Sequence, residues 1–136
     1  MKTLVLYYSY TGHTKKIAEE LAAKESFDIV SIKEMNRPGR FNAYSAGSFA
    51  ALRGKTWPIQ PLDVDLAAYD RLILLSPVWA NNPPPFVNTV LWQLPKGKTV
   101  SVKMVAASGK SKCKERIEAT ISAKNCTLDG FEDIKA

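Results

Sequence analysis

The residues best suited to bind a ligand form a short loop near the N-terminus, Ser9-Tyr10-Thr11-Gly12-His13-Thr14. The loop follows an apolar segment and carries the aliphatic hydroxyls of Ser9, Thr11 and Thr14 around a glycine. Hydroxyls and the free backbone N–H groups at the start of a helix can together bind a phosphate group. The loop matches neither a Walker sequence nor the GxGxxG pattern of dinucleotide sites. It therefore favours a single phosphate, although an ordinary helix-capping turn would have a similar composition.

Two later loops contain residues suited to a flat ring. The earlier one, Pro77-Val78-Trp79-Ala80-Asn81-Asn82, offers an indole that can stack on an aromatic ring and two amides that can bond to its edge. The alternative is that Trp79 packs back onto the following helix beside Phe86. The later loop contains Ser108 and Gly109, whose small size lets the backbone approach a ligand closely.

Metal sites and cysteine-based phosphatase sites find no support in the sequence. His13 is the single histidine, and Cys113 and Cys126 match no zinc or CxxC spacing. Neither cysteine has an arginine six positions later, which excludes the Cys-x5-Arg cradle of low-molecular-weight tyrosine phosphatases. Tyr8 and Ser76 stand where response-regulator receivers need acidic residues, so that class is excluded as well.

The elements that must position these loops alternate between strand and helix patterns, which predicts an α/β fold in a single domain spanning residues 1–136. Strand patterns occur at 3–8, 27–32, 71–76, 99–106 and 127–134, those at 3–8 and 71–76 being continuous apolar runs typical of buried strands, and helical spacing occurs at 14–24, 41–52, 86–94 and 111–123. In an open parallel sheet, ligands bind beyond the carboxyl ends of the strands. The three loops follow predicted strands, so we expect them to meet at that edge.

The composition is that of a globular protein, with 46% hydrophobic and 24% charged residues. The net charge of +6 is accounted for by residues 96–116, which hold seven cations and one anion. Such a block is either a solvated face or a site for a phosphate or an acidic partner. No apolar run approaches the roughly 18 residues of a membrane span or resembles a signal-peptide core. We therefore expect a cytoplasmic protein that binds neither nucleic acid nor membranes.

The sequence resembles the flavodoxin family over nearly its whole length. The resemblance rests on Ser9-x-Thr11-Gly12-x-Thr14 after the first strand, Val78-Trp79 after the third and Ser108-Gly109 after the fourth. It implies a doubly wound parallel sheet of five strands in the order 2-1-3-4-5, in a flavoprotein that binds FMN rather than FAD. The resemblance also implies that the first loop holds the phosphate and that Trp79 stacks on the ring. The cofactor-binding residues are then Ser9, Tyr10, Thr11, Gly12, His13, Thr14, Pro77, Val78, Trp79, Ala80, Asn81, Asn82, Ser108 and Gly109.

The sequence departs from typical flavodoxins in four ways. It is basic rather than acidic, and residues 107–114 contain no aromatic side chain to cover the second face of the ring. Ala80 stands where many carriers have glycine, and alanine resists the positive φ that glycine accepts. No helical pattern follows the last strand, so we expect an uncovered apolar area on one sheet face and homodimerisation through the sheet face or edge left bare.

These departures favour an FMN-dependent oxidoreductase. We expect electrons from NAD(P)H or an acidic protein donor to pass through FMN to a quinone-like or other small acceptor. One alternative is a flavodoxin proper, an electron-transport protein that docks on protein partners and has no substrate pocket. A second alternative is an interaction module that binds no flavin. No residue stands out as a catalytic proton donor, although Tyr10 and His13 lie in the first loop.

Overall fold

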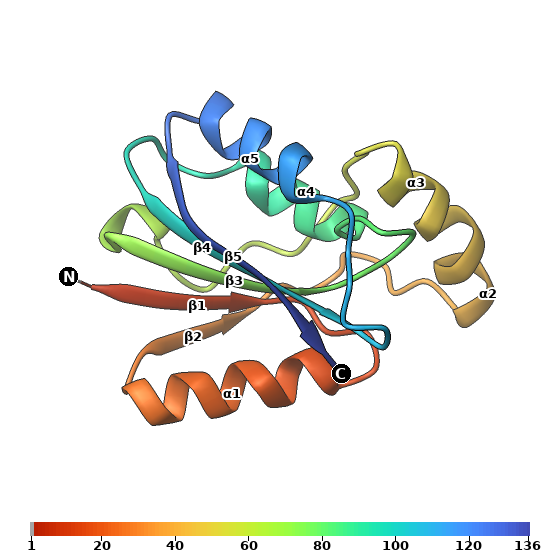
Figure 1. Ribbon diagram of the computed structural model, residues 1–136, viewed down its shortest axis with the longest axis horizontal. Helices are drawn as coiled ribbons and strands as arrows, with labels where there is room; N and C mark the ends of the chain where they lie inside the picture. The colour runs from red at the N-terminus through yellow and green to blue at the C-terminus, as the bar shows by residue number, and fades with distance from the viewer. Residues whose placement is uncertain (1) are drawn as a thin grey trace.

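The computed structural model describes residues 2–136, which form one five-stranded sheet with helices on both faces (Figure 1). The strand order is β2-β1-β3-β4-β5, and all neighbouring strands are parallel. This order and the α/β architecture confirm the predicted fold. The strands are β1 (Thr3–Tyr7), β2 (Asp28–Ser31), β3 (Arg71–Pro77), β4 (Thr99–Ala106) and β5 (Thr127–Lys135). The helical segments are α1 (His13–Glu25), α2 (Arg40–Asn42), η1 (Ala43–Gly47), α3 (Ser48–Leu52), η2 (Leu66–Ala68), α4 (Pro85–Trp92) and α5 (Lys114–Ala123).

Helix α1 covers one face of the sheet at β1, β2 and β3. Successive side chains of a strand point to opposite faces, so Val5 and Tyr7 of β1 pack against Ala18 and Ala22 of α1. The small alanine side chains let the helix lie close to the strands. The last two residues of the first loop, His13 and Thr14, form the start of this helix, so the packing of α1 holds the loop at the carboxyl end of β1.

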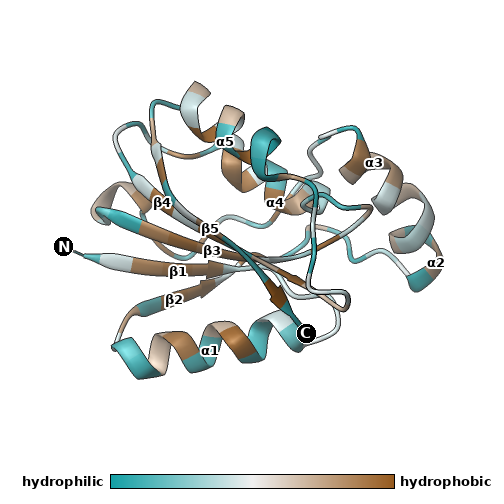
Figure 2. Ribbon diagram, in the orientation of Figure 1, coloured by the Kyte–Doolittle hydropathy of each residue, from teal (hydrophilic) through white to brown (hydrophobic). Residues whose placement is uncertain are grey.

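The opposite face carries the larger core, beneath α4 and α5 (Figure 1). Leu4 and Leu6 of β1 and Leu74 of β3 pack there with Val87 of α4 and Ile117 of α5. Figure 2 shows hydrophobic colouring along the central strands, which are covered on both faces. Burial on both faces explains why these strands are continuous apolar runs rather than alternating patterns.

Two helices differ in detail from their predicted form. The predicted helix at 41–52 is a continuous helical segment in which α2 and α3 flank a π-helical turn, η1. The helix predicted from residue 111 begins only at Lys114. Residues before it are held in the loop, because the Lys112 N–H donates to the Asn81 carbonyl and the Ser111 hydroxyl bonds to Asp133.

On the sheet face that α1 covers at β1, β2 and β3, the neighbouring area towards β4 and β5 carries polar side chains. Arg71 donates to the hydroxyl of Ser101 at 3.0 Å and lies 3.6 Å from Asp129, while Lys103 and Glu132 pair at 2.8 Å. The expectation of an apolar surface there is therefore wrong. Because these charges have partners within the sheet, the physical reason given for homodimerisation through this face is removed, and dimerisation remains an untested prediction.

No helix within residues 2–136 is long and apolar enough to cross a membrane. Over the same range there is no group of three or more His, Cys, Asp and Glu side chains placed to hold a metal ion.

Candidate functional site

The carboxyl ends of β1, β3 and β4 border a cleft of about 670 Å³. The structure brings the three predicted loops together around it. The predicted residues that line the cleft are Tyr10, Thr11, His13, Thr14, Pro77, Val78, Trp79, Ala80, Asn81 and Ser108. The other four, Ser9, Gly12, Asn82 and Gly109, lie in the same loops but do not line the cleft.

The first loop turns into α1 at Gly12, which has φ of 104°. This value suits glycine because it lacks a Cβ. The hydroxyl of Ser9 accepts a hydrogen bond from the Gly12 N–H at 3.0 Å, so Ser9 stabilises the turn itself. The first hydrogen bond of α1 runs from Lys16 N–H to the Gly12 carbonyl, which leaves the earlier N–H groups of the helix without a helical partner. Beside them, Thr14 is buried against the cleft, and this arrangement suits an anionic group.

The second loop is a tight turn from Trp79 to Asn82. The N–H and carbonyl groups of these two residues bond to each other at 2.8 and 3.0 Å. The two residues between them, Ala80 and Asn81, have positive φ values of 49° and 67°, as in a type I′ turn. Ala80 therefore adopts the conformation that we expected alanine to resist. Asn82 is buried and its amide donates to the Ala80 carbonyl at 2.8 Å, so Asn82 supports the turn from below the cleft surface.

Trp79 is half-buried among other aromatic side chains. Its ring makes edge-to-face contacts with Tyr8, Tyr10 and Phe86, at centroid distances of 6.0, 5.8 and 6.5 Å. On η1, a Cβ placed on Gly47 would come within 2.7 Å of the indole. Trp79 thus packs beside Phe86, which was the alternative to a role in ligand binding. It also lines the cleft, so the two roles are compatible.

The third loop supplies small residues. Ser108 lines the cleft together with Ala107 and Lys110. Gly109 has φ of 74°, and a Cβ there would lie 3.2 Å from the side chain of Lys135, so this glycine fits the loop against β5. Residues 107–113 thus contribute no aromatic side chain to the cleft lining.

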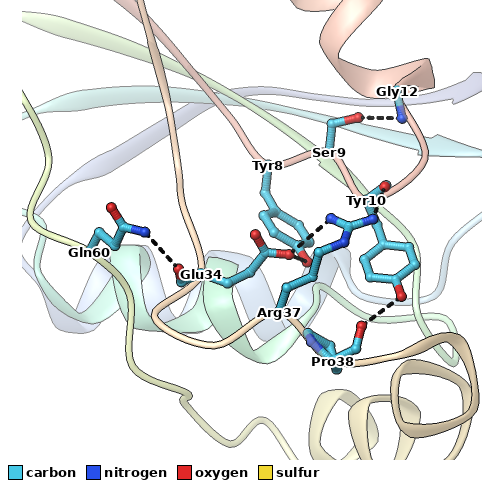
Figure 3. Close-up of polar contacts among 8 residues, drawn as sticks. All are labelled: Tyr8, Ser9, Tyr10, Gly12, Glu34, Arg37, Pro38 and Gln60. Atoms are coloured by element: carbon cyan, nitrogen blue, oxygen red, sulfur yellow. Dashed lines mark hydrogen bonds and ion pairs between the residues drawn. The ribbon is translucent and has the colours of Figure 1, made fainter.

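A fourth loop, after β2, reaches the site through residues that the sequence analysis missed (Figure 3). Arg37 donates from Nη2 to the backbone carbonyl of Tyr10 at 2.8 Å, and its guanidinium lies 4.1 Å from the centre of the Tyr10 ring. The Tyr10 hydroxyl donates to the carbonyl of Pro38 at 2.7 Å. Since this loop also follows a parallel strand, the rule that located the other three loops could have located it.

Glu34 lies at the centre of this network. Its carboxylate accepts a hydrogen bond from the buried hydroxyl of Tyr8 at 2.9 Å and lies 3.4 Å from Arg37 (Figure 3). Burial, followed by the hydrogen bond to Glu34, raises the pKa of Tyr8 well above its usual range. Tyr8 therefore stays neutral and serves as a hydrogen-bond donor that holds Glu34.

The two residues considered as proton donors have different surroundings. The hydroxyl of Tyr10 is already bonded to Pro38, which limits its use by a ligand. His13 is exposed at the edge of the cleft, with Nδ1 3.4 Å from the hydroxyl of Thr11. Of the thiols, Cys113 is buried, and this burial raises its pKa, so it is suited to packing rather than to nucleophilic chemistry.

The sequence matches no protein-family model and no curated protein. Solved structures do match nearly the whole chain. A Lactobacillus acidophilus flavoprotein in complex with FMN is 23% identical, with a TM-score of 0.75 over 96% of this chain and 91% of that chain. The apo-form of the flavoprotein from the same organism is 27% identical, with a TM-score of 0.71 over 97% and 92% of the two chains. Oxidised flavodoxin 2 from Bacillus cereus is 19% identical, with a TM-score of 0.58 over 100% and 86%.

Strand order, parallel pairing and the placement of α1 after the first loop are those expected from the resemblance. On this evidence, the chain has the flavodoxin-like fold.

Proposed function

We propose that this protein binds FMN in the cleft formed by the three loops and transfers electrons through it. The observation that carries the proposal is the arrangement of donors around one cavity of about 670 Å³. The start of α1 supplies free N–H groups beside the buried Thr14, and the second loop supplies the indole of Trp79. A similar solved structure, a flavoprotein in complex with FMN, supports the same ligand.

The chain's own residues fit the parts of FMN. Thr11 and Thr14 donate hydroxyl hydrogen bonds to the phosphate, next to the N-terminus of α1. Trp79 and Asn81 contact the flat ring, and the network around Arg37 keeps Tyr10 and the first loop in place. When bound, FMN supplies the ability to accept and donate electrons; the protein binds it, orients it and shields part of it from water.

For the reaction, we propose an oxidoreductase that takes electrons from NAD(P)H or an acidic protein donor and passes them to a quinone-like or other small acceptor. The small side chains of Ala107 and Ser108 in the cleft lining support this proposal, because a small acceptor needs access to one face of the ring. The second candidate is an electron carrier that docks on protein partners. It is favoured by large apolar side chains exposed on the helical segment next to the cleft, such as Phe41 and Tyr44.

FMN binding is tested by titrating apoprotein with FMN, riboflavin and FAD while recording tryptophan fluorescence. We expect FMN to bind most tightly, because riboflavin lacks the phosphate and FAD is larger than the single-phosphate loop. Thr14→Val should weaken FMN by about 1 to 3 kcal/mol and leave riboflavin nearly unchanged. Thr56→Val, at an exposed threonine that does not line the cleft, is the control. Equal affinities for FMN and riboflavin would remove the phosphate assignment.

The choice between oxidoreductase and carrier needs a second measurement on the FMN-loaded protein. Steady-state turnover with NAD(P)H and a soluble quinone supports the oxidoreductase. If neither nucleotide reduces the bound flavin, while protein donors reduce it rapidly, the carrier is the better description.

A further inference from the structure

The helical segment Arg40–Leu52, made of α2, η1 and α3, has its side chains arranged the opposite way from an ordinary surface helix. Its buried residues are all small: Ala43, Gly47, Ala50 and Ala51. A surface helix normally buries its large apolar residues and exposes polar ones. Here the small residues let the segment lie close to Trp79, which contacts the position of Gly47.

The large apolar residues of the segment point away from the core. Phe41 and Tyr44 are 80% and 83% exposed, and Phe49 and Leu52 are 55% and 53% exposed. We call these four side chains the outer helical face. Figure 2 shows hydrophobic colouring on α3 where it lies away from the sheet. Clustered exposure of this kind is typical of an interaction site, whereas single exposed apolar residues are common.

Positive charge surrounds the outer helical face. No Asp or Glu occurs between Met35 and Leu62, while Arg37, Arg40, Arg53 and Lys55 are exposed there. One cation of the basic block at 96–116 also reaches this segment, because Arg116 donates to the carbonyl of Ala51 at 3.0 Å. Arg116 therefore adds to the positive charge beside the outer helical face.

The outer helical face is also next to the cleft. A smaller cavity of about 300 Å³ is lined by Tyr44 and Ser48 of the segment and by Tyr10, Trp79 and Ala80 of the two loops. The larger cleft shares these last three residues. A molecule bound on the segment would therefore lie beside any ligand in the cleft. A π-helical turn, such as the one at Ala43–Gly47, is often found at functional sites.

We propose that the outer helical face is the docking surface for a protein partner whose contact surface has an apolar centre and an acidic rim. Charge complementarity selects this occupant over a second copy of the chain, since two copies with a net charge of +6 would bring like charges together. That the partner exchanges electrons with the cleft rests on the proposed function; the docking itself does not.

The test measures association with a small acidic [2Fe–2S] ferredoxin by calorimetry, using both apoprotein and FMN-loaded protein. Binding should occur with both forms and weaken about tenfold or more when salt is raised from about 0.05 M to about 0.5 M, because salt screens the charged rim. A basic c-type cytochrome of similar size should not bind at low salt. Since apoprotein is included, failure of FMN binding and failure of docking give different results.

Two double variants test the apolar and the charged residues, which are linked where the Arg53 guanidinium lies 4.7 Å from the centre of the Phe49 ring. Phe41→Gln with Phe49→Gln, and Arg40→Glu with Arg53→Glu, should each weaken ferredoxin association about tenfold or more. Neither pair lines the cleft, so FMN affinity should stay unchanged. The matched controls are Trp92→Gln, at an exposed aromatic residue at the end of α4, and Lys24→Glu, in the last turn of α1. Both controls should bind ferredoxin as the wild type does.

Three results would overturn the proposal. The first is no association with ferredoxin at low salt, or association that both double variants retain. The second is binding to vesicles containing anionic lipid that the variants abolish while ferredoxin does not bind, which would identify a membrane surface as the occupant. The third is a dimer in sedimentation that the Phe41 and Phe49 variant dissolves, which would identify a second copy.

Discussion

Arg37 holds Tyr10 at two points, by a 2.8 Å hydrogen bond to its backbone carbonyl and by the position of its guanidinium 4.1 Å from the centre of the Tyr10 ring. The two residues come from the loops after β2 and β1, which are neighbouring parallel strands. Arg37 therefore connects two loops: the loop after β2, to which it belongs, and the first loop, which is proposed to bind phosphate.

Arg37→Met should loosen the first loop and weaken FMN binding. A hydrogen bond from a charged donor contributes about 1.5 to 3 kcal/mol, and an exposed cation–π contact about 0.5 to 1 kcal/mol. Because the Arg37 side chain is 55% exposed, we expect a total near 1 kcal/mol, or roughly a fivefold loss of FMN affinity in a fluorescence titration. Lys33→Met, at an exposed cation in the same loop, is the control. An unchanged FMN affinity in Arg37→Met would show that the contact does not position the loop.

Tyr8 gives the protein a pH-dependent stability. Its pKa is raised mainly by burial, so above about pH 10 the folded state holds a proton that the unfolded state has lost. The free energy of unfolding should then fall as the pH rises through that value, by up to about 1.4 kcal/mol per pH unit. Urea unfolding between about pH 8 and 11 measures this slope. Tyr69, bonded to Asp28, has a pKa raised in the same direction and should contribute a further part.

Tyr8→Phe should reduce this alkaline slope. At neutral pH the same variant should lose about 1 to 3 kcal/mol, because Glu34 loses a buried donor. Tyr44→Phe removes an exposed hydroxyl and should keep the wild-type slope. If Tyr8→Phe keeps the full slope, the burial of the Tyr8 hydroxyl is not its source.

Ala80→Gly should stabilise the second loop slightly. A left-handed conformation costs a non-glycine residue about 1 to 2 kcal/mol, whereas glycine loses about 0.5 to 1 kcal/mol more chain entropy on folding. At φ of 49° the first effect is the larger, so we expect a gain of about 0.5 to 1 kcal/mol in urea unfolding. Ala107→Gly, in the third loop and without a positive φ, should destabilise instead. A loss of stability in Ala80→Gly would mean that Ala80 is not strained.

Gly47→Ala should disturb the contact between η1 and Trp79. The added Cβ would lie 2.7 Å from the indole, which forces either the ring or the helix to move. Overpacking of this kind costs about 1 to 3 kcal/mol, more than the roughly 1 kcal/mol that alanine gains over glycine in a helix. We expect a net loss of stability and a shifted tryptophan emission spectrum.

Gly39→Ala is the matched control for that prediction. Gly39 also has a negative φ, and a Cβ there would meet nothing within 4 Å. Its stability should be unchanged or slightly higher. Similar destabilisation in both variants would indicate a general effect of the helical segment rather than the contact with Trp79.

The sequence by itself determined where the strands lie and which loops face a ligand. The run from Thr3 to Tyr7 is apolar at nearly every position because both faces of β1 are covered, and such a run is readable without a structure. Loops after parallel strands meet at one edge of the sheet, so Thr14, Trp79 and Ser108 could be assigned to one cleft. The strand order itself came from the resemblance to flavodoxins, since apolar patterns do not state which strands are neighbours.

Only the tertiary structure decided how segments distant in sequence support one another. Arg37 contacts Tyr10 and Gly47 contacts Trp79, and neither contact leaves a periodic pattern in the chain. Periodicity also cannot show that the helical segment exposes Phe41 and buries Ala43, because an apolar side chain is normally assigned to the core. The indole of Trp79 leaves no room for a side chain at Gly47, and the other buried residues of the segment are alanines, so its large apolar side chains lie on the outer side.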